Sequence, residues 1–289
     1  MIQNKRNGLA IYAGGNHIFY IAGVLKFFTE KGLRFDAIAT YSAGSAILPF
    51  LVDGNLEDAP EVFGQYLDRN TRNFYPANLF TKDYIFPHDR IYSTAVASMV
   101  DLKKTVEYDK PLRVIVSEFE SRNSANGFVG LCAFLALLLN SLAKTETPSI
   151  FLRMFKSLFS IEGNVVDIRQ CKSKEEIVEV ILGSSTIYPF IHIRRRAGRS
   201  MLDGKLCLNS PIEALKDCEH VISIHGHHSF LPRRDGLVSV FPLSKVRVGS
   251  LDYVGSAGVK SAFAQGYGEG AQHYARLADS PFFSNDGQQ

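Results

Sequence analysis

The 289-residue sequence lacks paired cysteines, a strong surplus of one charge and any apolar run long enough to span a bilayer. Its four cysteines lie far apart without a C-x-x-C pair, which argues against a zinc site and favours reduced thiols. The formal charge of +3 is too small to indicate a nucleic-acid-binding protein. The most apolar stretch, Val129 to Ala143, is shorter than the roughly 20 residues of a transmembrane helix.

The first residues also lack the features of a secretory signal. Residues 1–12 are polar and then briefly apolar, without a longer apolar run or a small-residue cleavage site. We therefore expect a cytoplasmic or peripheral membrane protein, while a specialised, signal-less secretion route would leave no trace in the sequence. With 46% apolar and 21% charged residues and no repeat or linker, residues 1–289 are expected to form a single domain.

Strand and helix patterns alternate in the first fifty residues. A short apolar run ends at Tyr12, helical spacing follows as far as Lys31-Gly32, and a second strand and helix occupy 35–40 and 43–52. This order predicts an α/β fold with a mostly parallel sheet sandwiched by helices. Further elements are expected as strands at 112–117, 165–168 and 221–224, and as helices at 61–67, 173–183 and 256–278.

An apolar helical region is inserted at 118–162, with helices expected at 129–143 and around 151–159. These helices are either buried core helices or a lid that faces lipid, and the surrounding Lys144, Arg153 and Lys156 would suit a membrane surface. The aromatic residues of the segment 74–92 similarly fit a satellite core or an acyl pocket.

Two further polar clusters have alternative interpretations. A basic hairpin tip at 195–199 is either a solvated turn or a contact for lipid phosphate. Three histidines in 225–228 suggest a metal site, but they have no carboxylate partner, so a loop at a strand end is the preferred interpretation.

The residues that indicate chemistry lie where strands are expected to end. Ser42 follows a short apolar run, and Gly44 is the small residue that a nucleophile on a sharp strand-to-helix turn requires. A glycine turn at Gly14-Gly15-Asn16 and an Asp203-Gly204 turn follow other strands. Because the carboxyl ends of parallel strands share one crevice, the first two turns can meet there.

These three turns predict a serine acyl hydrolase. Backbone N–H groups of Gly14, Gly15 and Asn16 would form the oxyanion hole, Ser42 would attack an acyl carbon, and Asp203 would accept its proton. No metal or cofactor is needed for this chemistry.

Across nearly its whole length the sequence resembles the patatin-like phospholipase family of lipid acyl hydrolases. The motifs that carry the resemblance occur in the family order and are Ala13-Gly14-Gly15-Asn16-His17, Gly23-Val24-Leu25, Thr40-Tyr41-Ser42-Ala43-Gly44, Ser184-Ser185 with Pro189, Asp203-Gly204-Lys205 and Asn209-Ser210-Pro211. The resemblance implies a three-layer α/β fold and a Ser42–Asp203 dyad supported by Thr40, Gly44, His17 and Gly204.

Four positions depart from the family pattern. His17 stands where arginine or lysine is usual, Ile18 and Thr40 stand where glycine is common, and Lys205 replaces a small residue. The resemblance implies cleavage of carboxylic esters of phospholipids or lysophospholipids, with a peripheral membrane surface as partner, no nucleic acid and the oligomeric state left open. The alternatives are a thioesterase or small-ester esterase on the same dyad, and a lipid-binding or regulatory protein with a weakened site.

Overall fold

The computed structural model describes residues 6–80, 85–120, 126–143, 150–188, 190–207, 210–228 and 234–277. In these residues a single sheet of eight strands forms the centre of the fold. The strands are β1 (Asn7–Tyr12), β2 (Ala37–Tyr41), β3 (Leu112–Glu120), β4 (Glu162–Asp167), β5 (Arg194–Arg196), β6 (Arg199–Asp203), β7 (His220–His225) and β8 (Leu237–Val240).

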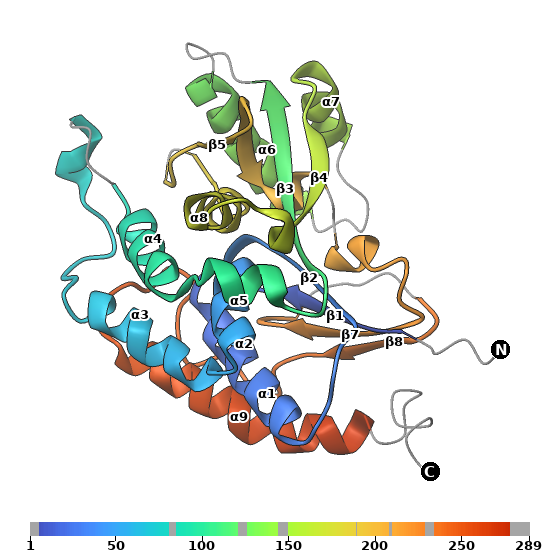
Figure 1. Cartoon of the computed structure of the whole chain (residues 1–289). Helices are drawn as coiled ribbons and strands as arrows, with labels where there is room; N and C mark the ends of the chain where they lie inside the picture. The colour runs from blue at the N-terminus through green and yellow to red at the C-terminus, as the bar shows by residue number, and fades with distance from the viewer. Residues whose placement is uncertain are drawn as a thin grey trace.

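The sheet is mixed but mostly parallel. Its order is β5-β6-β3-β2-β1-β7-β8, and β4 also pairs with β3. The five strands β3, β2, β1, β7 and β8 run parallel, whereas β4 and β6 are antiparallel to β3. The predicted fold class, an α/β fold with a mostly parallel sheet and flanking helices, is confirmed (Figure 1).

Helices are distributed along the whole chain. The α-helices are α1 (Ile18–Glu30), α2 (Leu48–Asp53), α3 (Ala59–Leu67), α4 (His88–Met99), α5 (Leu102–Glu107), α6 (Asn126–Ala143), α7 (Ile150–Leu158), α8 (Lys174–Gly183) and α9 (Ala257–Leu277). The 3-10 turns near the candidate site are η1 (Gly15–His17), η2 (Ser42–Ile47), η6 (Gly204–Leu206) and η7 (Pro211–Ala214). Helix α9 packs lengthwise against α1 beneath the sheet (Figure 1).

The two faces of the sheet are covered differently. Side chains alternate between the faces of a strand, so Leu9 and Ile11 of β1 enter the large core that contains the buried sides of α1 and α9. Ala10 and Tyr12 face a smaller cluster, which is covered by Ile212 of η7 and the residues that follow it. The second face of the sheet therefore has a thinner cover than the first.

Strand register aligns the carboxyl ends of the central strands. Tyr12, the last residue of β1, pairs with Tyr41 of β2 on one side and His225 of β7 on the other. Asp203, at the end of β6, pairs with Val116 of β3, one residue beyond the partner of Tyr41. The turns that follow β1, β2, β6 and β7 therefore leave the sheet at one edge.

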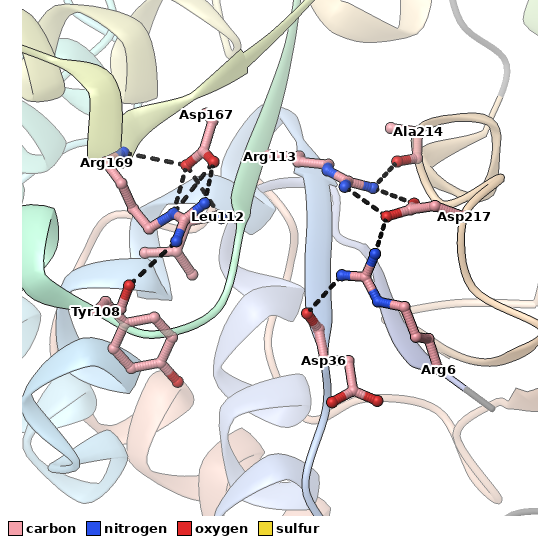
Figure 2. A network of polar contacts seen from close by, with 9 residues as sticks. All are labelled: Arg6, Asp36, Tyr108, Leu112, Arg113, Asp167, Arg169, Ala214 and Asp217. Atoms are coloured by element: carbon pink, nitrogen blue, oxygen red, sulfur yellow. Dashed lines mark hydrogen bonds and ion pairs between the residues drawn. The ribbon is translucent and has the colours of Figure 1, made fainter. Parts of the chain in front are cut away.

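The opposite edge of the sheet is held by an ion-pair network (Figure 2). Arg113 at the start of β3 contacts both carboxylate oxygens of Asp217, with N···O distances of 2.5 and 2.8 Å. Arg6, which precedes β1, donates to the same carboxylate at 2.7 Å and to the carbonyl oxygen of Asp36, which precedes β2, at 3.3 Å. The network joins the amino ends of three adjacent strands and lies away from the edge where the candidate catalytic residues gather.

Several elements differ from the sequence-based expectation. Helix α4 (His88–Met99) overlaps the end of the aromatic segment 74–92, and neither α4, α5 nor strand β8 was predicted. The helix expected at 43–52 begins as the 3-10 turn η2 and becomes α-helical only at Leu48. All four cysteines are free thiols, as predicted.

The apolar insert contains α6 and α7, which follow β3 in the chain. It lies at the end of the sheet where β3 extends to Glu120 (Figure 1). Its inner face includes Val129, Leu152 and Phe155, which pack with Phe119 and Leu202 of the sheet. None of the helices in the described ranges is long and apolar enough to cross a membrane. Of the predicted insert 118–162, residues 121–125 and 144–149 lie outside the described residues, so Lys144 does as well.

Candidate active site

Ser42 occupies the strained turn between β2 and η2. Its φ angle is +53°, and among the described residues only two other non-glycine side chains have a positive φ. This left-handed conformation costs a non-glycine residue roughly 1–3 kcal/mol, and such strain is concentrated at functional sites. Tyr41 and Ala43 are buried on either side, whereas Ser42 is partly exposed. The turn therefore presents the Ser42 hydroxyl at the carboxyl edge of the sheet.

Gly44 allows η2 to pack closely against the strand that precedes it. A Cβ at position 44 would overlap Thr40 Oγ1 and lie 3.1 Å from Ile11 Cγ2. Thr40 is fully buried, so its hydroxyl fills the space that a side chain at position 44 would need. Thr40, which stands where the family usually has glycine, therefore fits because position 44 is glycine.

The carbonyl oxygen of Ser184 joins the serine turn to the aspartate turn. It accepts the Ser42 N–H at 3.0 Å and the Gly204 N–H at 3.2 Å. The Ser184 hydroxyl also lies 2.9 Å from Ser45 Oγ and donates to the Ser42 carbonyl at 3.3 Å. Ser184 of the Ser184-Ser185 motif therefore positions both turns, while Pro189 of the same motif lies outside the described residues.

Asp203 is 3% exposed and points toward Ser42. Its Oδ1 accepts the Lys205 N–H at 2.9 Å, and its backbone is held by the Thr186 carbonyl and by the Ser117 hydroxyl, each at 2.9 Å. Burial raises the pKa of Asp203, and hydrogen bonds from the Ser42 hydroxyl and the Lys205 N–H oppose this increase. The structure thus brings the two predicted reacting groups together, although they are 161 residues apart in the sequence.

Gly204 allows the aspartate turn to pack closely against β3 and β2. A Cβ at this position would overlap the carbonyl oxygen of Ile115 and lie 3.0 Å from Tyr41 Cβ. The turn can therefore sit directly on β3 and β2 only with glycine at position 204. Asn209 of the motif that follows lies outside the described residues, and Ser210 caps η7 by accepting the Ile212 N–H at 3.1 Å.

The glycine turn after β1 lies beside the serine turn, because η1 and η2 are in contact. Gly15 has a φ of +54°, and a Cβ there would overlap the carbonyl oxygen of Ser250. Within the described ranges, neither the Gly14 N–H nor the Gly15 N–H has a hydrogen-bond partner. Two adjacent amides at the start of α1 are thus available to an anionic oxygen.

The role of Asn16 differs from the predicted one. Its N–H donates to the Ser250 carbonyl at 2.9 Å, and its side-chain amide donates to the Asp252 carbonyl. Its Oδ1 accepts the hydroxyl of Tyr92 at 2.9 Å, and the whole residue is buried. Because its donors are already used, Asn16 anchors the glycine turn. Of the three predicted oxyanion donors, Gly14 and Gly15 are the two whose N–H groups have no partner among the described residues.

His17 and the histidine loop lie at the rim of the site. The His17 ring is 6.2 Å from that of His227, between centroids, and burial lowers the pKa of both. His225 is instead stacked between Tyr12 and Phe241, and burial lowers its pKa to about 3. No cluster of potential metal ligands is found among the described residues, so the geometry gives the metal hypothesis for 225–228 no support.

The basic hairpin is engaged in ion pairs within the protein. Arg194 contacts the buried Asp89 at 2.5 Å and Glu179 at 2.7 Å. Burial raises the pKa of Asp89, but its contacts with His192 and Arg194 outweigh this and hold that pKa below its ordinary value. Arg196 and Arg199 contact acidic residues as well. Within the predicted tip 195–199, Arg196 and Arg199 are thus engaged in ion pairs, and the contact of this tip with lipid phosphate stays a prediction.

Several positioning residues were missed by sequence reasoning. Ser45 and Ser250 are common residue types in unremarkable contexts, and nothing in their local pattern points to the site. Tyr92 belongs to α4, a helix that was not predicted, and it reaches Asn16 across 76 residues. Contacts of this kind depend on tertiary packing, which leaves no periodic signal in the sequence.

The arrangement contains the groups that nucleophilic acyl transfer requires. It holds a strained serine, a buried carboxyl beside it, and two N–H groups that have no hydrogen-bond partner among the described residues. Comparison with known families supports this interpretation. The family model described as patatin-like phospholipase matches residues 9–216, a range that includes the serine, glycine and aspartate turns. A search of curated proteins finds no match to the chain.

Proposed function

The chain belongs to the patatin-like phospholipase family, and from this premise we propose that it hydrolyses carboxylic esters of phospholipids or lysophospholipids through an acyl-Ser42 intermediate. Family membership implies lipid acyl hydrolase activity in general. The observation that carries the finer proposal is the position of the buried Asp203 carboxyl beside Ser42 on its strained turn, where the Ser42 hydroxyl lowers the Asp203 pKa.

In the proposed mechanism Ser42 Oγ attacks the ester carbonyl carbon while its proton passes to Asp203. The carbonyl oxygen becomes an oxyanion, which the N–H groups of Gly14 and Gly15 stabilise. The tetrahedral intermediate then expels the glycerol oxygen, which takes the proton from Asp203. A water molecule next attacks the acyl-serine with Asp203 again as base, and this releases the fatty acid and restores the hydroxyl of Ser42.

The raised pKa of Asp203 suits this role. A carboxylate of ordinary basicity is a weak base for a hydroxyl proton, whereas a buried carboxylate is more basic and still ionised above its pKa. The Lys205 N–H and the Ser42 hydroxyl limit the increase. The pKa of Asp203 is therefore higher than that of an exposed carboxyl group but lower than that of a buried one without these donors.

A lipid substrate is supported by the exposed apolar surface of α6 and α7. Large apolar side chains on these helices point outward, although the inner faces of both helices are packed against the sheet. The outward residues and their exposed fractions are Phe128 (62%), Leu131 (43%), Leu135 (45%), Met154 (66%) and Leu158 (77%). With the exposed Arg153 beside them, they fit a peripheral contact with an anionic bilayer.

Aromatic rings connect this insert to the segment before α4. Phe134 of α6 is 5.0 Å from Phe190, which is 4.8 Å from Phe86, and Phe86 is 5.3 Å from Phe74, all between ring centroids. Phe190 belongs to the segment that begins with Ser184 beside Ser42. The predicted choice between a satellite core and an acyl pocket stays open, because an aromatic row from the insert to the segment before α4 is consistent with both.

The test is release of fatty acid from micellar lysophospholipid by the wild type, Ser42→Ala and Asp203→Asn. Ser160→Ala is the matched control, because Ser160 is also a serine with positive φ and lies at the end of α7. We expect both site variants to lose at least about 100-fold in kcat and the control to keep full activity. Undiminished turnover in either site variant would remove that residue from the mechanism.

The alternatives give different results in the same assays. A lipid-binding or regulatory protein would bind anionic liposomes without turnover in the wild type. A thioesterase or small-ester esterase would prefer short synthetic esters or thioesters to long acyl chains in a chain-length series. Replacing Met154 and Leu158 by glutamate should weaken liposome binding while leaving turnover of a soluble short-chain ester intact, because both side chains face outward.

A further inference from the structure

Three basic side chains from three separate elements lie within electrostatic reach of one another beside the candidate site. His17 ends η1 directly after the glycine turn, Lys205 lies in η6 directly after the aspartate turn, and His227 follows β7. In the strand order, β6 and β7 lie on opposite sides of β2, whose end carries Ser42. Lys205 and His227 thus approach the Ser42 opening from opposite directions.

The fold fixes His17 and His227 at close distance. The Gly226 N–H donates to the Tyr12 carbonyl at 2.9 Å, which continues the pairing of β1 with β7 beyond the strands. A Cβ at position 226 would lie 2.6 Å from His17 Cβ, so the loop rests directly on the His17 side chain. The resulting centroid distance of 6.2 Å between the His17 and His227 rings allows one anionic group to contact both.

No acidic partner in the described residues neutralises this cluster. Lys205 forms no ion pair and the His227 ring forms no hydrogen bond within the described ranges. His17 lies 3.4 Å from Ser250 Oγ and hydrogen-bonds with the backbone of Val248, but neither partner is acidic. The charged and titratable groups near His227 are Lys205, His17 and His228. Burial lowers the pKa of His227, and the positive charges of these neighbours lower it further.

The Lys205 charge also acts on the Asp203 carboxylate. One oxygen of that carboxylate already accepts the Lys205 N–H, and the Ser42 hydroxyl lies beside it. An anion between the three basic side chains would therefore meet the Lys205 charge and would favour the protonated forms of His17 and His227. Lys205 and protonated histidine both form strong, charge-assisted hydrogen bonds with phosphate oxygens.

We propose that His17, Lys205 and His227 form a phosphate subsite that holds the phosphodiester of a lysophospholipid while its ester lies at Ser42. This inference rests on the proposed function and names a headgroup feature of its substrate. Only the glycerol backbone separates the phosphodiester of such a lipid from its ester. A subsite next to the glycine turn could therefore hold the phosphodiester while the ester lies at Ser42. A neutral glyceride has no phosphate for it to bind.

The main measurement is the ratio of kcat/KM for a lysophospholipid to kcat/KM for a monoacylglycerol with the same acyl chain, both in neutral mixed micelles. Since Ser42 and Asp203 act on both substrates, their contribution cancels in the ratio. We expect His227→Gln and Lys205→Met each to lower the ratio about tenfold, the effect of one lost charge-assisted hydrogen bond. We also expect the wild-type ratio to fall as pH rises, because phosphate binding favours the protonated imidazoles.

The matched control is His228→Gln, since His228 is in the same loop but stacks on Phe241 at 5.3 Å. Its ratio should equal that of the wild type. An unchanged ratio in His227→Gln and Lys205→Met, or an equal drop in the control, would overturn the subsite.

A measurement independent of turnover separates this inference from the proposed function. In the Ser42→Ala protein, imidazole NMR signals are titrated with inorganic phosphate and with glycerophosphocholine. Both should raise the pKa of His227. A response to neither overturns the subsite even if the enzyme is active, and a response to inorganic phosphate alone overturns its assignment to a lipid headgroup. If the proposed function itself is wrong, the wild type will instead turn over neither lipid.

Discussion

Replacement of Gly44 by alanine tests whether the serine turn depends on the close packing seen in the structure. The added Cβ would overlap Thr40 Oγ1 and lie 3.1 Å from Ile11 Cγ2. Thr40 is completely buried and cannot move into solvent, and its hydroxyl makes only one long hydrogen bond, 3.4 Å to the Tyr41 carbonyl. Relief of the overlap therefore requires η2 to shift, and Ser42 moves with it.

The expected size of the effect follows from these contacts. Overpacking of a well-packed core costs about 1–3 kcal/mol, and the overlap here involves a rigid, buried partner, so we expect about 2 kcal/mol for Gly44→Ala. Thr40→Ala removes the overlapping oxygen and should itself cost about 1 kcal/mol through lost packing. In the double variant the new methyl group has room, so the two costs should not add. The coupling should amount to about 1–2 kcal/mol.

The assay is urea unfolding of the wild type, the two single variants and the double variant, combined with fluorophosphonate reactivity. Gly44→Ala should be less stable and react more slowly, and Thr40→Ala should restore both properties in the double variant. The reasoning fails if the two free-energy changes add to within about 0.5 kcal/mol, or if Gly44→Ala is as stable and reactive as the wild type.

Three other predictions concern the support and titration of the site. Tyr92→Phe should lower kcat several-fold with little change in KM, because the anchor of the glycine turn at Asn16 loses its 2.9 Å hydrogen bond; an unchanged kcat would contradict this positioning role. Because burial raises the pKa of Asp203, which acts in its ionised form, kcat/KM should decline as pH falls through a value above the ordinary 3.8, and an acid limb at or below 3.8 would argue against Asp203 as the base. Arg113 lowers the pKa of Asp217 to about 2, so its stabilisation is present above pH 3.8 and is lost as pH falls through about 2. Asp217→Asn should therefore cost about 1 kcal/mol at neutral pH, a value reduced for screening since the carboxylate is 36% exposed, and urea unfolding curves of variant and wild type should converge near pH 2.

The elements predicted well are those with a local signal. β1, α1 and β2 have apolar periodicity and glycine stops, and the helix α8 begins at a capping box in which Ser173 accepts the Glu176 N–H. The order of these elements already places the glycine and serine turns at one edge. Sequence reasoning therefore reaches Ser42 and Gly14-Gly15 without coordinates.

The parts missed are those set by long-range contacts. Helix α4 was obscured because its aromatic and polar residues pack against the turn at Asn16 and the segment at Tyr253, not along one periodic stripe. Asn16 was predicted as an oxyanion donor from its position beside two glycines, but its amide is taken by Ser250 from the other end of the chain. The pairing of Asp203 with Ser42 came from motif order, and its physical basis, the carbonyl of Ser184 between two turns, required the structure.

The central claim is that Ser42 is a nucleophile activated by Asp203. Its most direct test is reaction with a fluorophosphonate, followed by peptide mass spectrometry to locate the adduct. We predict a single adduct on Ser42 in the wild type, none in Ser42→Ala, and labelling at least about 100-fold slower in Asp203→Asn, which loses the base. Asp203→Asn should remain at least as stable as the wild type at neutral pH, because the raised pKa means that ionised Asp203 is disfavoured by folding there. An adduct on another residue, or equal labelling in a folded Asp203→Asn, would contradict the account.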